Sequence, residues 1–304
     1  MDKFARLEQE LHRLAPGLEL LPQEPLSRHT TFRIGGPASL LVIPHSEEAL
    51  QAALQAAARL DARVEALGNG SNLLVGDGPV EAMVVKTLGG LTQLERTGPE
   101  EITCGSGVTM ARAALFAGEH GLTGLEFSHG IPGTMGGGVV MNAGAYNGEL
   151  KDVVSSTRHL TLSGHPGQFD LAGLDFGYRH SAYSAGGFII TSVTLRLRPG
   201  DPAAIRARID ELWSRRQASQ PLEYPSGGST FKRPAGHYAA ALIQDCGLKG
   251  LTVGGAQVSE KHSGFVINRG NATCADVLAL TDKIREEVFR QTGVTLELEV
   301  RRLH

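Results

Sequence analysis

The stretch GIPGTMGGGVVMNAGAYNGE, residues 130–149, contains seven glycines and neither lysine nor arginine. Glycine inside a helix or strand lowers stability, so this density indicates either tight turns or backbone that lies against a ligand. An ordinary glycine-rich hairpin has the same composition. The stretch by itself therefore leaves both interpretations open.

The length and composition are those of a globular protein. The chain has 304 residues, of which 41% are apolar and 20% are charged, and its net charge is −3. A single core rarely grows to this size, so we expect two or three compact units. The charge balance does not favour nucleic acid or an anionic membrane as a partner. No protein partner is evident.

The amino-terminal segment predicts an amphipathic helix with Phe4, Leu7, Leu11 and Leu14 along one face. Charged residues interrupt it throughout, so it is neither a signal peptide nor a membrane span. The cysteines, three in number and far apart, give no disulfide framework and no metal-ligand spacing. We expect a soluble cytoplasmic protein without a metal site.

The rest of the chain alternates between helix and strand signals. Helices are predicted from Ser46 to about Leu60, from Thr109 to His120 with Gly121 as the left-handed end, after Asp201-Pro202, and from about Ala275 to Gln291. Strands are predicted in RVEALG (63–68), MVVKTL (83–88), GFIITSVTLRLRPG (187–200) and VTLELEVRRL (294–303). We place a domain boundary near residue 200.

Several familiar sites are excluded. The chain has no GxxxxGK[ST] phosphate loop, no HExxH, no GxSxG and no CxxC. Two near-matches to the Rossmann fingerprint, at residues 68–70 and 105–107, have Leu73 and Met110 where the third glycine belongs. The segment GNGSN (68–72) is compatible with an anion-binding nest of backbone N–H groups, and equally with a plain turn.

Seven segments of the chain form a recognisable series. They are HTTFRIGGPA (29–38), LGNGSNLLV (67–75), GLEFSHGIPGTMGGGVVMNAGAYNGE (124–149), LDFGYRHS (174–181), PSGGSTFKRP (225–234), GLKGLTVGGAQVSEKHSGFVIN (247–268) and LELEVRRL (296–303). In this order they resemble the UDP-N-acetylenolpyruvoylglucosamine reductase family, over about residues 26–303. The chain resembles the shorter type of the family, because only 50 positions separate Arg179 from Ser229 and leave little room for an extra substrate-closing loop.

The resemblance implies an α+β fold whose FAD-binding region is of the vanillyl-alcohol oxidase / p-cresol methylhydroxylase type. The implied domains are an N-terminal helix and lead-in (1–30), an FAD-binding domain (31–198, with subdomains of about 31–67 and 68–198), and an α+β substrate-binding domain (199–304). The opening stretch then becomes a flavin cradle. The implied FAD contacts are Gly68, Asn69, Gly70, Ser71, Asn72, Pro132, Gly133, Thr134, Gly136, Gly137, Asn142, Gly144 and Ala145.

The resemblance also implies the chemistry. NADPH would reduce a non-covalent FAD, which would pass hydride to the double bond of UDP-N-acetylglucosamine enolpyruvate and give UDP-N-acetylmuramate, a peptidoglycan precursor. Charge develops beside the carboxylate and must be stabilised and then protonated. The matching residues are Arg179 for the carboxylate, Ser229 as proton donor, and Glu299, which would polarise the intermediate or share the proton. Glu299 is chosen over Glu297 because the family's catalytic glutamate directly precedes the valine of the terminal motif, here Val300.

Further substrate contacts are implied for Tyr178, Lys232, Arg233, His262 and Arg301. Arg233 departs from the asparagine usual in the family, and Ala241 departs from a common lysine. His262 is included only by proximity, and a structural histidine is an equal alternative.

Two other functions remain open. One is a flavin oxidase of the same superfamily, for which His129 would be the candidate for covalent flavin attachment. The other is a non-catalytic protein that binds a UDP-sugar or a flavin, which would not need Arg179, Ser229 and Glu299 together.

Overall fold

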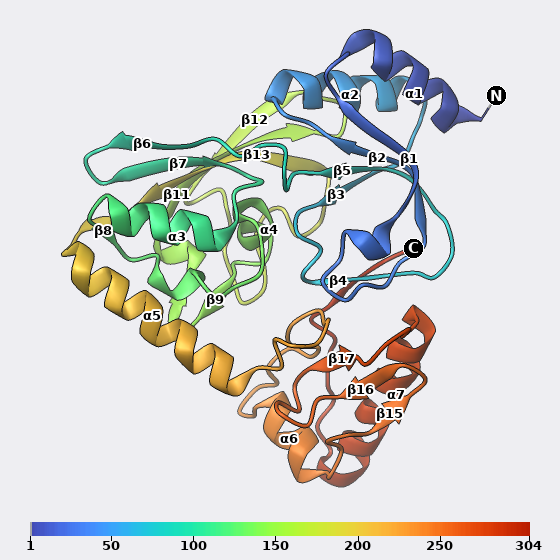
Figure 1. Cartoon of the computed structure of the whole chain (residues 1–304), viewed down its shortest axis with the longest axis vertical. Helices are drawn as coiled ribbons and strands as arrows, with labels where there is room; N and C mark the ends of the chain where they lie inside the picture. The colour runs from blue at the N-terminus through green and yellow to red at the C-terminus, as the bar shows by residue number, and fades with distance from the viewer. Residues whose placement is uncertain (1) are drawn as a thin grey trace. The chain divides into compact units, whose positions relative to one another are not determined.

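The computed structural model describes residues 2–304, which form two compact units (Figure 1). Within the described residues, unit 1 comprises residues 2–23, 39–69 and 81–215, and unit 2 comprises residues 24–38, 70–80 and 216–304. Each unit is therefore built from segments that are far apart in the sequence. The functional domain boundaries predicted at residues 30 and 198 stay predictions, because packing alone does not test them.

The first sheet of unit 1 has the strand order β1-β2-β5-β3. Two helices, α1 and α2, pack on it through apolar side chains that include Leu7, Leu54 and Val85, all fully buried (Figure 1). The elements are α1 (Lys3–Leu14), β1 (Glu19–Pro25), β2 (Pro37–Ile43), α2 (Glu47–Arg59), β3 (Val64–Leu67) and β5 (Val80–Lys86).

The second sheet of unit 1 is antiparallel, in the order β12-β11-β13-β7-β6. Helices α3, α4 and α5 belong to this half. The elements are β6 (Leu94–Gly98), β7 (Glu101–Gly105), α3 (Met110–Glu119), α4 (Met135–Val140), β11 (Val154–Thr161), β12 (Pro166–Asp170), β13 (Phe188–Arg196) and α5 (Pro202–Ser219).

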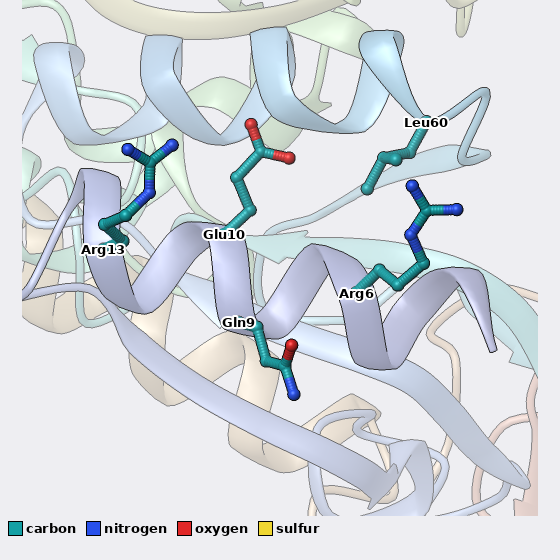
Figure 2. Close-up of a pocket in the computed structure, with 5 residues that line it drawn as sticks. All are labelled: Arg6, Gln9, Glu10, Arg13 and Leu60. Atoms are coloured by element: carbon teal, nitrogen blue, oxygen red, sulfur yellow. The ribbon is translucent and has the colours of Figure 1, made fainter. Parts of the chain in front are cut away.

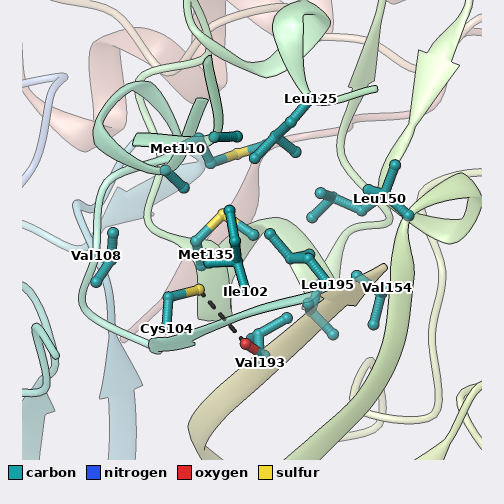
Figure 3. Packing of buried hydrophobic residues seen from close by; sticks show 14 of the residues in the cluster. Ile102, Cys104, Val108, Met110, Leu125, Met135, Leu150, Val154, Val193 and Leu195 are labelled. Atoms are coloured by element: carbon teal, nitrogen blue, oxygen red, sulfur yellow. Dashed lines mark hydrogen bonds between the residues drawn. The ribbon is translucent and has the colours of Figure 1, made fainter. Parts of the chain in front are cut away.

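The core beneath this sheet joins β7 and β13 to α3 and α4 (Figure 3). Met110 and Met135 fill it together with Ile102 and Leu195, and the Cys104 thiol donates to the Val193 carbonyl oxygen at 3.5 Å. Burial raises the pKa of Cys104 to about 12, so this thiol stays protonated. The core thereby fixes α4, the helix formed by the glycine-rich stretch, on the sheet.

Short elements complete unit 1. The pairs β9-β10 and β8-β14 are both antiparallel. Their bounds and those of the 3₁₀ turns are β8 (Leu122–Thr123), η2 (Glu126–Ser128), β9 (Gly144–Ala145), β10 (Gly148–Glu149), η3 (Leu150–Asp152) and β14 (Arg198–Pro199).

Unit 2 packs a small antiparallel sheet, β15-β16-β17, against α7 around buried Phe231, Leu280 and Ile284. A second pair, β4 with β18, is parallel and joins the chain end to residues 73–75. The elements are η1 (Leu26–Arg28), β4 (Leu73–Val75), α6 (Ala239–Asp245), β15 (Thr252–Val253), β16 (Ala256–Val258), β17 (Val266–Asn268), α7 (Cys274–Thr292) and β18 (Arg301–Leu303).

The local helix signals are confirmed. Ser46, Thr109 and Asp201 each accept backbone N–H bonds at the start of α2, α3 and α5. Gly121 has a φ of +65°, as its position after α3 predicts. The prediction for α1 is wrong at one residue, since Leu14 is 41% exposed whereas Phe4, Leu7 and Leu11 are buried.

The predicted carboxy-terminal strand is wrong in extent. Only Arg301–Leu303 forms a strand, and the preceding residues make a single bridge, between Leu298 and Phe231. Partners change along this segment, from residues 230–232 to residues 73–75, so no continuous ladder forms. The long strand predicted over 187–200 is likewise divided, into β13 and β14, which pair with different strands.

Candidate functional site

Two of the predicted cofactor segments meet in unit 1. The Asn69 amide Nδ2 donates to the Pro132 carbonyl oxygen. A Cβ placed on Gly68 would lie 2.5 Å from the Thr134 hydroxyl oxygen, a separation that no side chain tolerates. Gly68 is therefore required by the close approach of LGN to IPGT, and the two glycine-rich clusters form one surface.

A third segment, Gly105-Ser106-Gly107, packs against α4. The Gly136 N–H donates to the Ser106 carbonyl oxygen at 2.9 Å, and a Cβ on Gly136 would lie 2.7 Å from the Ser106 Cβ. The Ser106 hydroxyl is buried and, within residues 2–304, has no hydrogen-bond partner. A buried hydroxyl without a partner costs about 1–3 kcal/mol, so a polar ligand atom fits here. In the sequence this GSG is only an incomplete Rossmann fingerprint, so the sequence predicts no cofactor contact there.

Gly137 differs from its neighbours in α4. Gly136 and Gly138 face protein, whereas Gly137 is exposed, and the nearest atom to a Cβ added there is the Thr134 hydroxyl at an ordinary 3.4 Å. Its φ lies outside the left-handed region. Nothing within residues 2–304 requires glycine at this position. A flat ligand that lies against the helix would require it, which fits an FAD cradle.

The amino-terminal N–H groups of α4 are used within the protein. Met135 donates to the Val108 carbonyl oxygen at 2.8 Å, Gly136 donates to Ser106, and Gly137 donates to the Thr134 side chain at 3.3 Å. These groups are not left for a phosphate, so the helix end does not act as a Rossmann-type anion site. The absence of that fingerprint from the sequence agrees with this arrangement.

The other predicted cofactor residues have diverse settings. Gly70 has a φ of +59°, and its carbonyl oxygen accepts from Thr31 N–H at 3.3 Å. Ser71 is half-buried, and both residues belong to unit 2. The Gly133 carbonyl oxygen accepts from Met110 N–H, while Gly144 and Ala145 form β9 opposite Glu149 and Gly148.

Arg179 lies in a tight turn of unit 1, in which Gly177 and His180 exchange backbone hydrogen bonds of 3.1 and 3.3 Å. Its φ is +53°, a conformation that a non-glycine residue rarely adopts and that recurs at functional sites. The guanidinium lies over the exposed Tyr178 ring, 5.2 Å from its centroid. The turn thus presents a cation and an aromatic ring together.

The turn rests on the segment that follows α4. Asn142 is buried, with a φ of +41°, and its amide Nδ2 donates to the Gly177 carbonyl oxygen at 3.0 Å. The same amide donates to Glu149 at 2.9 Å. The ion pair with Lys151 lowers the pKa of Glu149, and Asn142 and the nearby Arg179 lower it further.

Ser229 and Glu299 lie on adjacent backbone segments of unit 2. The Glu299 N–H donates to the Thr230 carbonyl oxygen at 2.9 Å. Thr230 is itself fixed, because its N–H donates to Gly264 and its hydroxyl accepts from Val266 N–H, both at 2.9 Å. The Ser229 side chain is exposed and makes no hydrogen bond within residues 2–304. A fixed backbone therefore presents a serine hydroxyl to solvent.

Asn72 forms hydrogen bonds to the backbone on both sides of Val300, at Glu299 and at Arg301. Its amide Nδ2 donates to the Glu299 carbonyl oxygen at 3.2 Å, and its own carbonyl oxygen accepts from the Arg301 N–H at 3.0 Å. The last residue of GNGSN is thus joined to two of the predicted site residues at the chain end. The sequence predicts only a cofactor contact for Asn72, because the pairing spans more than 200 positions.

The remaining predicted substrate residues of unit 2 have partners on the surface. Lys232 pairs with Glu297 at 3.2 Å, an exposed ion pair. The Arg233 guanidinium lies 4.0 Å from the centroid of the Tyr238 ring, which is 61% exposed. His262 accepts from Gly264 N–H at 3.2 Å, and burial lowers its pKa.

His129, the candidate for covalent flavin attachment, contacts α5. Its ring meets Trp213 edge to face, with centroids 5.9 Å apart. Its Nδ1 atom is buried without a hydrogen-bond partner in the described chain, and burial lowers its pKa.

One open pocket of about 360 Å³ lies apart from these residues, where α1 faces the end of α2 (Figure 2). It is lined by Arg6, Gln9, Glu10, Arg13 and Leu60, and Glu10 pairs with Arg59. No predicted site residue lines it. In residues 2–304 there is no cluster of three or more His, Cys, Asp or Glu side chains suited to a metal. The same residues include no helix long and apolar enough to cross a membrane.

Comparison with known proteins defines the class. Residues 38–166 match the model of an FAD binding domain. A glucooligosaccharide oxidase from Acremonium strictum shares the fold at 13% identity, with a TM-score of 0.50 over 96% of this chain and 60% of that one. The predicted fold class is confirmed, because the chain has an α+β fold with an FAD-binding domain and shares that fold with this flavin oxidase.

The particular family follows from the other matches. Residues 220–303 match the model of the UDP-N-acetylenolpyruvoylglucosamine reductase C-terminal domain. The reductase of that name from Agathobacter rectalis is 46% identical over 94% of this chain and 94% of its own length. The reductase from Geobacillus kaustophilus is 43% identical over 99% of this chain and 98% of its own length. The crystal structure of the Thermus caldophilus reductase has a TM-score of 0.80 at 35% identity, over 94% of this chain and 99% of that one. The chain belongs to the UDP-N-acetylenolpyruvoylglucosamine reductase family.

Proposed function

We propose that this protein reduces UDP-N-acetylglucosamine enolpyruvate to UDP-N-acetylmuramate, a step toward peptidoglycan, with NADPH as the reductant. The observation that carries the proposal is the cradle made by three glycine-rich segments, with one exposed glycine on α4 and the buried Ser106 hydroxyl beside it. The flavin domain and the family's own C-terminal domain occur together in the chain. We infer a cytoplasmic location from the two nucleotide substrates.

FAD, when bound, supplies the hydride chemistry between NADPH and the enolpyruvyl double bond. Gly68, Asn69 and residues 132–137 would hold it, since their backbones converge and Gly137 leaves room for a flat ring. We also propose FAD contacts for four further residues: Gly70, Ser71, Gly144 and Ala145. We assign the flavin-binding role to residues 31–198 and the sugar-nucleotide role to residues 199–304.

The protein's own groups would handle charge and protons at the substrate. The Arg179 guanidinium suits a bidentate hold on the enolpyruvyl carboxylate, where negative charge develops. Ser229 would deliver the proton, because its hydroxyl is exposed and makes no internal bond that would have to break. Glu299, held by Thr230 and Asn72, would stabilise the intermediate or share that proton.

Contacts to the diphosphate would come from cations. Arg233, stacked on Tyr238, offers a guanidinium in place of the usual asparagine, and Lys232 and Arg301 offer two further charges. Tyr178 would contact the substrate beside Arg179. His262 is engaged in its own turn, so we assign it a supporting place rather than a direct one.

The two half-reactions provide the test. Under anaerobic conditions NADPH should bleach the flavin absorbance of the purified protein, and UDP-N-acetylglucosamine enolpyruvate should restore it. UDP-N-acetylglucosamine, which lacks the double bond, should not. Denaturation should release free FAD. Bleaching of the oxidised flavin by an alcohol, followed by recovery when oxygen is admitted, would instead indicate the oxidase function, as would flavin that stays on the denatured chain.

A further inference from the structure

The side chain of Asn142 uses its hydrogen-bonding groups within the protein. Its two amide hydrogens go to Glu149 Oε2 at 2.9 Å and to the Gly177 carbonyl oxygen at 3.0 Å, and its Oδ1 accepts from Lys151 N–H at 2.9 Å. An asparagine amide has only two hydrogens to donate. Asn142 therefore has no N–H left for a cofactor, and its role lies in what it connects.

What it connects is the turn that carries Arg179. The Gly177 carbonyl oxygen closes that turn with His180 and also accepts the bond from Asn142. A second anchor follows directly, because the Ser181 and Ser184 hydroxyls both donate to the Val140 carbonyl oxygen, at 3.0 and 3.1 Å. Both anchors belong to the end of α4 and the residues after it.

The turn needs such anchors. The left-handed conformation of Arg179, with a φ of +53°, is strained for a residue other than glycine and persists only where its surroundings hold it. Asn142 is itself left-handed and almost fully buried, so it forms a rigid support. Glu149, the other acceptor of its amide, is a carboxylate near the Arg179 guanidinium.

We propose that Asn142 is a positioning residue for Arg179, fixing through the Gly177 carbonyl the turn that aims the guanidinium at the substrate carboxylate. The proposal rests on the function proposed above. It predicts that loss of the Asn142 amide weakens the hold on a carboxylate and leaves the flavin in place. A direct flavin contact by Asn142 would predict the reverse.

The test uses Asn142→Gly, which keeps the left-handed backbone and deletes the amide. Asn147→Gly is the matched control, because Asn147 is also left-handed, with a φ of +67°, lies in the adjacent hairpin, and makes no side-chain hydrogen bond in the described chain. Ser184→Ala loosens the same turn through its other anchor. Calorimetry of the oxidised holoenzyme then compares UDP-N-acetylmuramate, which carries the carboxylate, with UDP, which does not.

We expect Asn142→Gly to bind UDP-N-acetylmuramate about 10- to 100-fold more weakly, the range for a charge-assisted contact. UDP affinity and flavin content should not change, and Asn147→Gly should match the wild type. Ser184→Ala should show the same pattern to a smaller degree. In an Arg179→Lys background, Asn142→Gly should have little further effect.

Other outcomes would overturn the proposal. Loss of flavin from Asn142→Gly would make Asn142 a cofactor ligand, and an equal loss of affinity for UDP and UDP-N-acetylmuramate would make its role purely structural. Effects that add to those of Arg179→Lys would show that it acts elsewhere. If Arg179→Lys by itself left UDP-N-acetylmuramate affinity unchanged, the proposed role of Arg179 would fail instead, which is a separate result.

Discussion

Substitution of Gly137 by alanine should change flavin binding and the stability of the flavin-free protein in opposite directions. Gly137 is an exposed residue in the first turn of α4, and an added Cβ meets only the Thr134 hydroxyl, at 3.4 Å. Without flavin the methyl group therefore fits. Because alanine is favoured over glycine in a helix by roughly 0.5–1 kcal/mol, the flavin-free protein should become slightly more stable.

With flavin the same methyl group should be harmful. If the ring lies against the Gly137 backbone, the extra carbon overpacks the contact, which typically costs about 1–3 kcal/mol, or roughly 5- to 150-fold in the dissociation constant. Flavin fluorescence would measure the dissociation constant, and thermal unfolding of the flavin-free protein would measure stability.

Gly138→Ala is the control, because its Cβ would lie 2.8 Å from the buried Leu150 side chain and 3.0 Å from the Met110 sulfur. That variant should lose stability even without flavin. An unchanged flavin affinity in Gly137→Ala would refute the cradle. So would a loss of affinity that is matched by an equal loss of stability in the flavin-free protein.

Three further outcomes follow. Ser229→Ala should leave flavin bleaching by NADPH nearly intact and slow reoxidation by the enolpyruvyl sugar about 10²- to 10⁴-fold. Ser229→Cys should recover part of the reoxidation rate. Equal slowing of both steps in stopped-flow absorbance would show that Ser229 is not the proton donor. Asn72→Ala, which deletes one bond to the Glu299 carbonyl, should slow reoxidation by about 3- to 10-fold, and unchanged reoxidation would show that this bond does not position Glu299. The pKa of Asp276 is lowered by backbone N–H bonds from Thr273 and Gly255 at the start of α7, so its stabilising effect is present above its unfolded pKa and is lost as the pH falls. Urea unfolding should therefore separate the wild type from Asp276→Asn more widely at neutral pH than in acid, and an equal gap at both would contradict this.

The parts of the fold that the sequence predicts are those set by neighbours in the chain. Ser46, Thr109 and Asp201 identify helix starts because an N-cap acts within three residues. The sequence pattern makes the terminal strand too long because a period of two cannot reveal a change of partner. The two-unit division is equally hidden, since it depends on long-range contacts such as the Asp77 carboxylate that caps α7 at Cys274.

The site shows the same limit. The glycine clusters and the positions of Arg179, Ser229 and Glu299 can be identified from motifs. The hydrogen-bond partners of Asn72 and Asn142 cannot be identified in this way, because each side chain bonds a backbone carbonyl distant in the sequence, and a backbone carbonyl gives no sequence signal. Ser106 has a signal, the GSG at the end of β7, but only the buried and unpartnered hydroxyl makes it a candidate.

The most direct measurement of the proposed activity is the mass of the sugar nucleotide after anaerobic turnover with NADPH in deuterated water. Reduction of the enolpyruvyl double bond adds one hydride from NADPH and one proton from solvent. The account predicts a sugar nucleotide that has gained two hydrogens at the former double bond, at least one of them a deuterium from the solvent, with one NADPH consumed for each molecule of product. NADPH consumption that leaves the mass of the sugar nucleotide unchanged would contradict it.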